Sequence, residues 1–159
     1  MAQTINTLTA SQPAGDPSYG GMYYNSTGVV LTVGTGGQYE LMTGLSNGII
    51  KGAPYVTGAS NTLTVGASGA GVYHVCINAS CASNAVDELV EMALWVNGAE
   101  ETKVESKKKA SRAGDEIPMS AQGFVTLAAG GYIDVRFSTT TSGKTVTVYV
   151  VNMTMTRIA

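Results

Sequence analysis

The stretch "AAGGYIDVRFSTTTSGKTVTVYVVNMTMTRIA" spans Ala128–Ala159 and contains two contrasting strand patterns. In its first half, Ile133, Val135 and Phe137 alternate with polar or aromatic residues, as expected of a strand with one face on a core. In its second half both faces are apolar. Valines at positions 146, 148 and 150 occupy one face, and the other face carries Tyr149, Val151, Met153 and Met155. The stretch predicts an antiparallel sandwich whose closing strand needs cover on both sides.

The composition favours one all-β domain. The chain has 159 residues, of which 44% are hydrophobic and 13% charged, and its twenty glycines accompany many Thr and Val residues. β-branched residues fit a pleated sheet, and glycine serves the turns. A net charge of -2 gives no reason to expect a nucleic-acid partner. The sequence has neither a secretory signal nor about 18 continuous apolar residues, so we expect no membrane partner and production in a host cytoplasm.

Short apolar runs about ten residues apart predict nine or ten antiparallel strands, arranged as a jelly-roll sandwich. Asn97–Gly98 is the strongest hairpin signal. Residues 87–95 also have nearly helical apolar spacing, but the hairpin turn that follows favours a strand. We expect residues 123–131 and 132–140 to pair with each other, and residues 45–60 to form an irregular connection. Residues 1–18 are polar, contain two prolines and predict an arm that precedes a domain at 19–159.

No residue pattern predicts catalysis, a cofactor or a metal site. His74 lies at an alternating strand position, which favours a structural or interface role over that of a general base. The carboxylates at 87–91 and 100–105 are expected to be solubilising charges beside turns. The basic run Lys107–Lys109 with Arg112 predicts a solvated loop. Cys76 and Cys81 would lie about 16 Å apart on an extended strand, so we expect buried free thiols.

The order of the motifs resembles the tumour-necrosis-factor-like jelly roll, which complement-type globular heads and many bacteriophage structural proteins share. The resemblance covers residues 19–158. It rests on Gly71–Tyr73 at the start of a central strand, the "VNG" hairpin at Val96–Gly98, the "GFVTLAAG" block at Gly123–Gly130, and a final strand near the C-terminus. One departure is Gly131, which stands where the family usually has an acidic residue.

The resemblance implies a homotrimer in which the closing strand belongs to the sheet that packs around a threefold axis. A sister chain would then cover Tyr149, Val151, Met153 and Met155. Leaving such side chains wet would forgo about 1.5–3 kcal/mol each. The alternative is that a loop, or the arm, covers this face within one chain.

The function expected from this resemblance is that of a non-enzymatic virion protein. We expect a trimeric phage capsid decoration, or cement, protein on the capsid surface, bound to the major capsid protein or another virion protein. Its arm would contact the capsid through Ile5, Leu8, Pro13 and Pro17. The alternative is a receptor- or glycan-binding head of a tail or head fibre, for which Tyr55 is the clearest exposed aromatic candidate.

Overall fold

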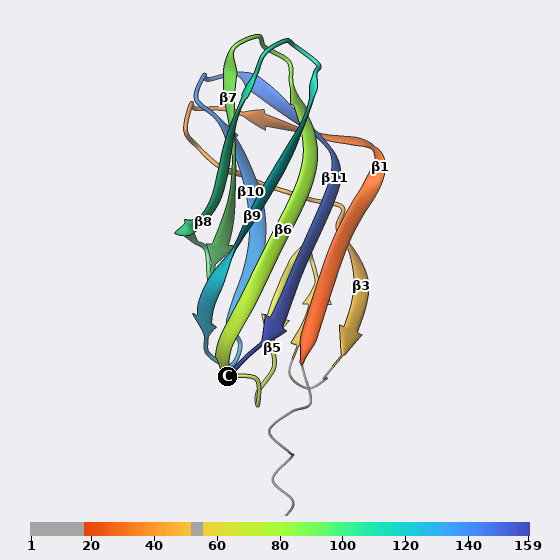
Figure 1. Ribbon diagram of the computed structural model, residues 1–159, viewed down its shortest axis with the longest axis vertical. Coiled ribbons are helices and arrows are strands. Elements are labelled where there is room, and N and C mark those ends of the chain that lie inside the picture. The colour runs from red at the N-terminus through yellow and green to blue at the C-terminus, as the bar shows by residue number, and fades with distance from the viewer. Residues whose placement is uncertain (1–17, 52–55) are drawn as a thin grey trace, which may run out of the picture.

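The computed structural model describes residues 18–51 and 56–159 of the chain. Those residues form eleven strands in two antiparallel sheets and no helix. One sheet has five strands, in the order β3 (Ser46–Lys51), β1 (Tyr19–Val33), β11 (Lys144–Arg157), β6 (Gly71–Ser83) and β9 (Glu116–Leu127). Figure 1 shows this sheet in front, with its long strands running down the molecule.

The second sheet lies behind the first and has the order β4 (Val56–Ala59), β5 (Thr62–Val65), β10 (Tyr132–Thr139), β7 (Glu88–Val96) and β8 (Ala99–Ala110). A short strand, β2 (Glu40–Leu41), also pairs with β10. The antiparallel jelly-roll prediction is confirmed, but the strands number eleven and not nine or ten. The difference arises between residues 45 and 60. The predicted irregular connection is wrong there, because β3 and β4 form within it.

Apolar side chains from both sheets fill the space between them, and this burial holds the sandwich together. The fully buried members of the five-stranded sheet include Tyr73, Val75, Ile77, Val146, Val148, Val151, Met153 and Met155. Those of the opposite sheet include Leu63, Val90, Met92, Leu94, Ile133, Val135 and Phe137. The predicted alternation at residues 133–137 is therefore confirmed.

A β-bulge changes which residues of β11 face the core. Opposite β6, Val148 pairs with Cys81 and Val150 with Ser80, so β11 carries one extra residue. β1 is irregular at the same level, between Asn25 and Val29. An extra residue reverses the alternation of a strand. Val146 and Val148 therefore face the core before the bulge, and residues 151, 153 and 155 face it afterwards. The expectation of two apolar faces is wrong, because β11 has one core face that shifts phase.

Two predicted connections have different outcomes. The hairpin at Asn97–Gly98 joins β7 to β8, and both residues have positive φ, as a two-residue hairpin turn requires. The predicted pairing of 123–131 with 132–140 is wrong, because β9 pairs with β6 whereas β10 belongs to the other sheet. The turn at residues 128–131 carries the chain between sheets and is held there by Val65, which exchanges hydrogen bonds with Gly130 and Gly131.

Candidate interface on the five-stranded sheet

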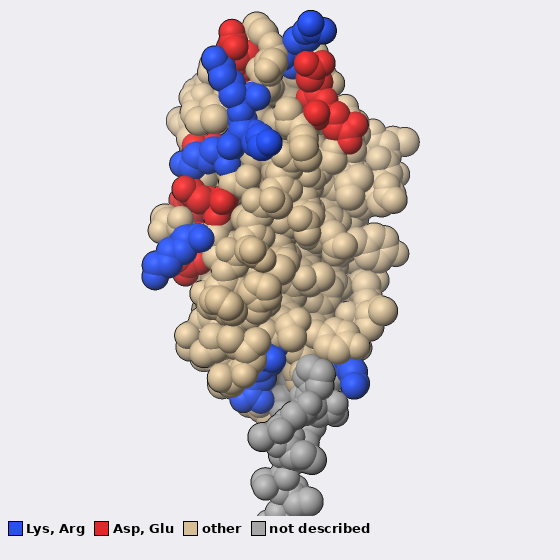
Figure 2. Space-filling model, viewed as in Figure 1, with Lys and Arg blue, Asp and Glu red and all other residues tan. Residues whose placement is uncertain are grey.

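The five-stranded sheet carries charge only at the ends of its strands. Its acidic and basic residues are Lys51, Glu116, Lys144 and Arg157, each of which is the first or last residue of a strand. β1 and β6 have none. In Figure 2 the broad middle of this face is free of red and blue, and the charged side chains lie along its upper margins and at its lower end. We call the outward side of this sheet the neutral face.

Strand pairing arranges the outward residues of the neutral face in rows that cross the sheet. The first row contains Tyr19, Thr156, His74 and Phe124. The second contains Gly21, Thr154, Cys76 and Gln122. The third contains Tyr23, Asn152, Asn78 and Ser120. Each row therefore places a residue of β1 level with a residue of β9, at the other side of the sheet.

Large apolar side chains stand out from the neutral face. Their exposed fractions are 48% for Tyr23, 60% for Val30, 76% for Ile49, 65% for Phe124 and 38% for Val150. Between them lie mainly Thr, Asn and Ser side chains, which are polar but uncharged. Such a surface can be buried against another protein without the cost of desolvating a charge.

Phe124 is held by a neighbour from β6. Its ring lies 5.0 Å from the His74 ring, centroid to centroid, in a tilted arrangement. On the other side of His74, the Cys76 Sγ atom lies 3.8 Å from Nε2 and 3.9 Å from Nδ1. Thus the sole histidine of the chain lies at the neutral face, beside an exposed aromatic ring, as expected for a structural or interface residue.

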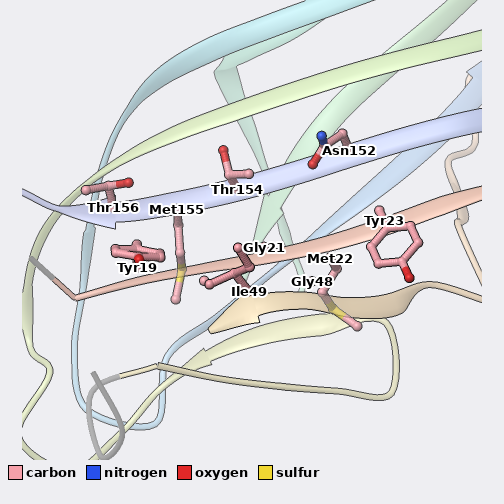
Figure 3. Close-up of a pocket in the computed structure, with 11 residues that line it drawn as sticks. Tyr19, Gly21, Met22, Tyr23, Gly48, Ile49, Asn152, Thr154, Met155 and Thr156 are labelled. Carbon is pink, nitrogen blue, oxygen red and sulfur yellow. The ribbon is translucent and has the colours of Figure 1, made fainter. Parts of the chain in front are cut away.

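A hollow of about 460 Å³ lies at the β3–β1–β11 side of the neutral face. We call it the lateral hollow. Figure 3 shows Tyr19 and Tyr23 at its two ends, with Thr156, Thr154 and Asn152 following one another along β11. Gly21 and Gly48 keep its floor open, since neither fills it with a side chain. A Cβ atom added at Gly21 would lie 3.3 Å from a methyl carbon of Thr154.

A second hollow, of about 440 Å³, lies at the opposite side of the same face, between β6 and β9. Its lining is mostly polar and includes Cys76, Asn78, Ser120 and Gln122. The neutral face therefore has depressions near both lateral ends, with Phe124 projecting beside the second one.

Of the four residues predicted to meet a sister chain, the structure leaves one on the neutral face. Tyr149 lies half-buried at the bulge, on the same side as Thr147. Val151, Met153 and Met155 are fully buried within the single chain. Their own sandwich covers them, so the reason for expecting a partner over these three is wrong. Ile5, Leu8, Pro13, Pro17 and Tyr55 lie outside the described residues.

The residues that sequence reasoning missed are Tyr23, Val30, Phe124 and Val150. A usable signal was present. The stretches 52–86, 117–133 and 145–156 contain no Asp, Glu, Lys or Arg, although half of each strand in a two-layer sandwich should face outward. Long uncharged runs in strands predict a sheet that is covered on both of its faces.

Charge concentrates on the opposite sheet, where Lys107–Lys109, predicted to lie in a solvated loop, are in fact part of β8. Lys107 pairs with Glu91 at 3.1 Å and with Glu105 at 3.5 Å, and Lys109 pairs with Asp87 at 3.0 Å. The Lys107 ammonium group makes both the Glu91 and the Glu105 contact. These contacts, above all the one with Glu91, raise the pKa of Lys107. Lys107 to Lys109 are thus part of an exposed strand, on which Lys107 and Lys109 are paired, whereas Arg112 does lie in the turn after β8, as predicted.

An aromatic cluster also lies on this sheet. The Arg136 guanidinium lies 4.0 Å from the centre of the Trp95 ring and donates hydrogen bonds to Asp134 at 2.8 and 3.2 Å. Tyr39 packs edge-on against Trp95 and donates to Glu91 at 3.3 Å. Burial, followed by the Glu91 charge, raises the pKa of Tyr39. These contacts tie β2, β7 and β10 together.

Glu88 corrects a further expectation. It is buried, and its carboxylate accepts hydrogen bonds of 2.9 Å from the Thr140 hydroxyl and from the Thr141 backbone N–H. Burial alone would raise the pKa of Glu88, but these hydrogen bonds outweigh it and the pKa is lowered. Glu88 therefore fastens a loop and is not a solubilising charge.

Cys76 and Cys81 are both free thiols, and they face opposite sides of β6. Cys81 is buried beside Met119, with 3.6 Å between the sulfur atoms, and burial raises its pKa to about 12. Cys76 is half-buried at the neutral face, so the prediction of two buried thiols is right for Cys81 alone. Among residues 18–51 and 56–159, no three His, Cys, Asp or Glu side chains gather as a metal site requires.

Comparison with known proteins supports the fold. No protein-family profile matches the chain, and no curated protein matches it in sequence. Solved structures do match. Eiger TNF from S. frugiperda is 14% identical, with a TM-score of 0.67, over 91% of this chain and 94% of that one.

The globular domain of zebrafish complement 1qA protein is 12% identical, with a TM-score of 0.52, over 91% of this chain and 98% of that one. PRD1 vertex protein P5 is 10% identical, with a TM-score of 0.58, over 89% and 97%. The chain has the TNF-like jelly-roll fold that the sequence motifs predicted. In the part of the chain that the structure describes, no helix has the length and hydropathy to cross a bilayer.

Proposed function

We propose that the chain is a non-enzymatic structural protein that assembles as a homotrimer through the neutral face. The observation that carries this proposal is the charge distribution. The five strands of this sheet have charged residues only at their ends, while four large apolar side chains on β1, β9 and β11 stand more than a third exposed. An exposed apolar surface of this kind is typical of a protein–protein interface.

The energetics support self-association. Burying Tyr23, Val30, Phe124 and Val150 would add the part of the about 1.5–3 kcal/mol per large apolar side chain that corresponds to their still exposed fractions, 38% to 65%. Three contacts close a ring, and this gain is made at each of them. This gain opposes the loss of translational and rotational freedom, which costs roughly 4–15 kcal/mol for each of the two associations that build a trimer. The absence of central charges means that no large desolvation term opposes it.

The finer proposal is that the trimer is a capsid decoration protein in a phage virion, bound to the major capsid protein. Its support is the fold shared with PRD1 vertex protein P5, together with the neutral face of the five-stranded sheet. A protein that binds one particle state stabilises that state by mass action. The function would be mechanical: each trimer adds buried area across the seams of the shell.

A fibre head that binds a receptor or glycan is the second candidate, because jelly-roll heads of this fold also suit a terminal position. The copy number in purified virions separates the two. Decoration is supported if each virion has hundreds of copies and if their removal also lowers the resistance of the particle to heat or pressure. A few copies at a vertex or tail support the fibre head.

Sedimentation of the purified protein tests the trimer. We expect a particle of three times the 16.3 kDa chain mass at micromolar concentration. The double variant Val30→Glu/Val150→Glu places charge on the neutral face and should sediment as a folded monomer. Val86→Glu is the matched control, because Val86 is 62% exposed and lies in the turn between β6 and β7. A monomeric parent protein would contradict the proposal.

Truncation tests the predicted arm. Removing residues 2–17 retains Ser18, whose carbonyl accepts a hydrogen bond of 2.8 Å from the Arg157 N–H at the end of β11. The truncated chain should still form trimers but should no longer bind shells that lack the decoration protein. Full shell binding by the truncated chain would contradict the capsid-contact role of Ile5, Leu8, Pro13 and Pro17.

A further inference from the structure

We infer that Phe124 of one copy inserts into the lateral hollow of a second copy. The neutral face of each copy would then supply both the projecting side chain and the hollow that receives it. This inference rests on the proposed trimer and specifies its geometry. Phe124 projects from β9, at one side of the sheet, with 65% of its surface exposed. The lateral hollow lies at the other side, over β1, β3 and β11.

The two features lie at the same level. Phe124 pairs with His74, His74 with Thr156, and Thr156 with Tyr19, and both Thr156 and Tyr19 line the hollow. Rotation about an axis parallel to the strands moves a copy around the axis without shifting it along the axis. A knob and a hole can therefore meet in a closed ring only if they share a level, as these do.

In the proposed trimer the contact is heterologous, meaning that different surfaces of the two copies meet. Such contacts close into rings when the rotation permits. A twofold dimer whose axis runs parallel to the strands would bring the same two features together, with Phe124 of each copy on the hollow of the other. The choice of three copies over two therefore rests on the proposed trimer, and sedimentation distinguishes the two assemblies.

Size and chemistry also match. A cavity of about 150 Å³ can hold benzene, and the lateral hollow is about 460 Å³ and open to solvent. It is uncharged, and glycines at 21 and 48 leave its floor bare. The Phe124 ring is already oriented by His74 at 5.0 Å, so less side-chain freedom is lost when the ring docks.

A reciprocal contact follows from the same juxtaposition. Tyr23 borders the lateral hollow in the third row, level with Asn78 and Ser120. Those two residues line the second hollow, beside Phe124. When Phe124 of one copy enters the lateral hollow of the next, Tyr23 of that next copy faces the polar second hollow of the first. A phenol suits this site, because its hydroxyl can bond to amide and hydroxyl groups.

Photo-cross-linking tests the contact directly. Phe124 is replaced by p-benzoyl-phenylalanine in the full chain, which keeps an aromatic ring at this position. Mixed heavy-isotope and normal chains are then irradiated, and the adducts are mapped by mass spectrometry. We expect adducts between copies at residues 19–23, 48–49 and 152–156. Adducts at other sites in a sample that sediments as a trimer would overturn the inference and leave the trimer standing. A monomer in sedimentation would overturn both.

Two substitutions test the knob and the hole separately. Phe124→Ala removes the ring, and Gly21→Val fills the hollow; each should weaken every contact by at least about tenfold in its dissociation constant. The matched controls are Val86→Ala, at an exposed apolar residue in the turn between β6 and β7, and Gly34→Val, where an added Cβ meets nothing within 4 Å. Circular dichroism and thermal unfolding of the variants report on folding. Unchanged trimer affinity in folded Phe124→Ala would overturn the inference.

Discussion

Tyr149 of β11 covers Gly28 of β1. A Cβ atom at Gly28 would lie 3.2 Å from two carbons of the Tyr149 ring and 2.8 Å from a methyl carbon of Thr147. Gly28 has φ of 114° and sits in the irregular part of β1, opposite the β11 bulge. This contact locks the two bulges together, at the level where β11 changes the residues that it presents to the core.

Gly28→Ala should therefore destabilise the protein by about 1–3 kcal/mol, because the new side chain meets both a left-handed backbone and a crowded site. Chemical denaturation measures the change in the free energy of unfolding. Gly34→Ala serves as the control, since that position is open and has no positive φ; it should change stability by no more than about 0.5 kcal/mol. Equal effects at the two glycines would show that the bulge contact does not contribute.

Arg136→Met should cost about 3 kcal/mol of stability. The change leaves the Asp134 carboxylate, which is 2% exposed, without its cation, and removes the guanidinium from the face of Trp95. Adding Asp134→Asn to this variant should recover part of the loss, because it removes the unpaired charge. Lys109→Met is the control: its pair with Asp87 is mostly exposed and should contribute less than about 1 kcal/mol. No recovery in the double variant would argue against the buried charge as the cause.

The stabilising contribution of Glu88 should be lost in acid. Its pKa is lowered in the folded state, so its contribution is present above the unfolded pKa of about 4.3 and is lost as pH falls through the folded value. Denaturation curves between pH 7 and pH 2 should show a steeper acid loss for the parent than for Glu88→Gln. The variant should also be less stable at pH 7. Parallel curves for the two proteins would contradict this role of Glu88.

The alkylation rates of the two cysteines test the assembly, because each chain contains both a buried thiol, Cys81, and a thiol on the neutral face, Cys76. Alkylation requires the thiolate, and Cys81 is buried with a pKa raised to about 12, so it should react at pH 8 only after unfolding. Cys76 lies on the neutral face and should react more slowly in the trimer than in the monomeric Val30→Glu/Val150→Glu variant. Mass spectrometry follows each site over time. Equal Cys76 rates in the two proteins would place Cys76 outside the interface.

Local sequence determined the strands with regular alternation. Ile133, Val135 and Phe137 face the core as expected, and the Asn97–Gly98 turn joins β7 and β8, because period-two patterns and positive-φ turn residues act over a few neighbours. Together with the order of the motifs, these elements were enough to predict an antiparallel TNF-like jelly roll.

Local sequence could not predict which face of the sheet each β11 side chain occupies. Each bulge depends on how β1 and β6 align with β11, and a shift of one residue moves Val151, Met153 and Met155 from one side to the other. The same holds for the step from β9 to β10, where the choice of partner strand is made by long-range packing. The sequence by itself determined that the chain folds as a two-layer β-sandwich. Only the tertiary structure decided which surface stays uncharged and open, because facing is set by pairing register, and register is a property of strands far apart in the chain.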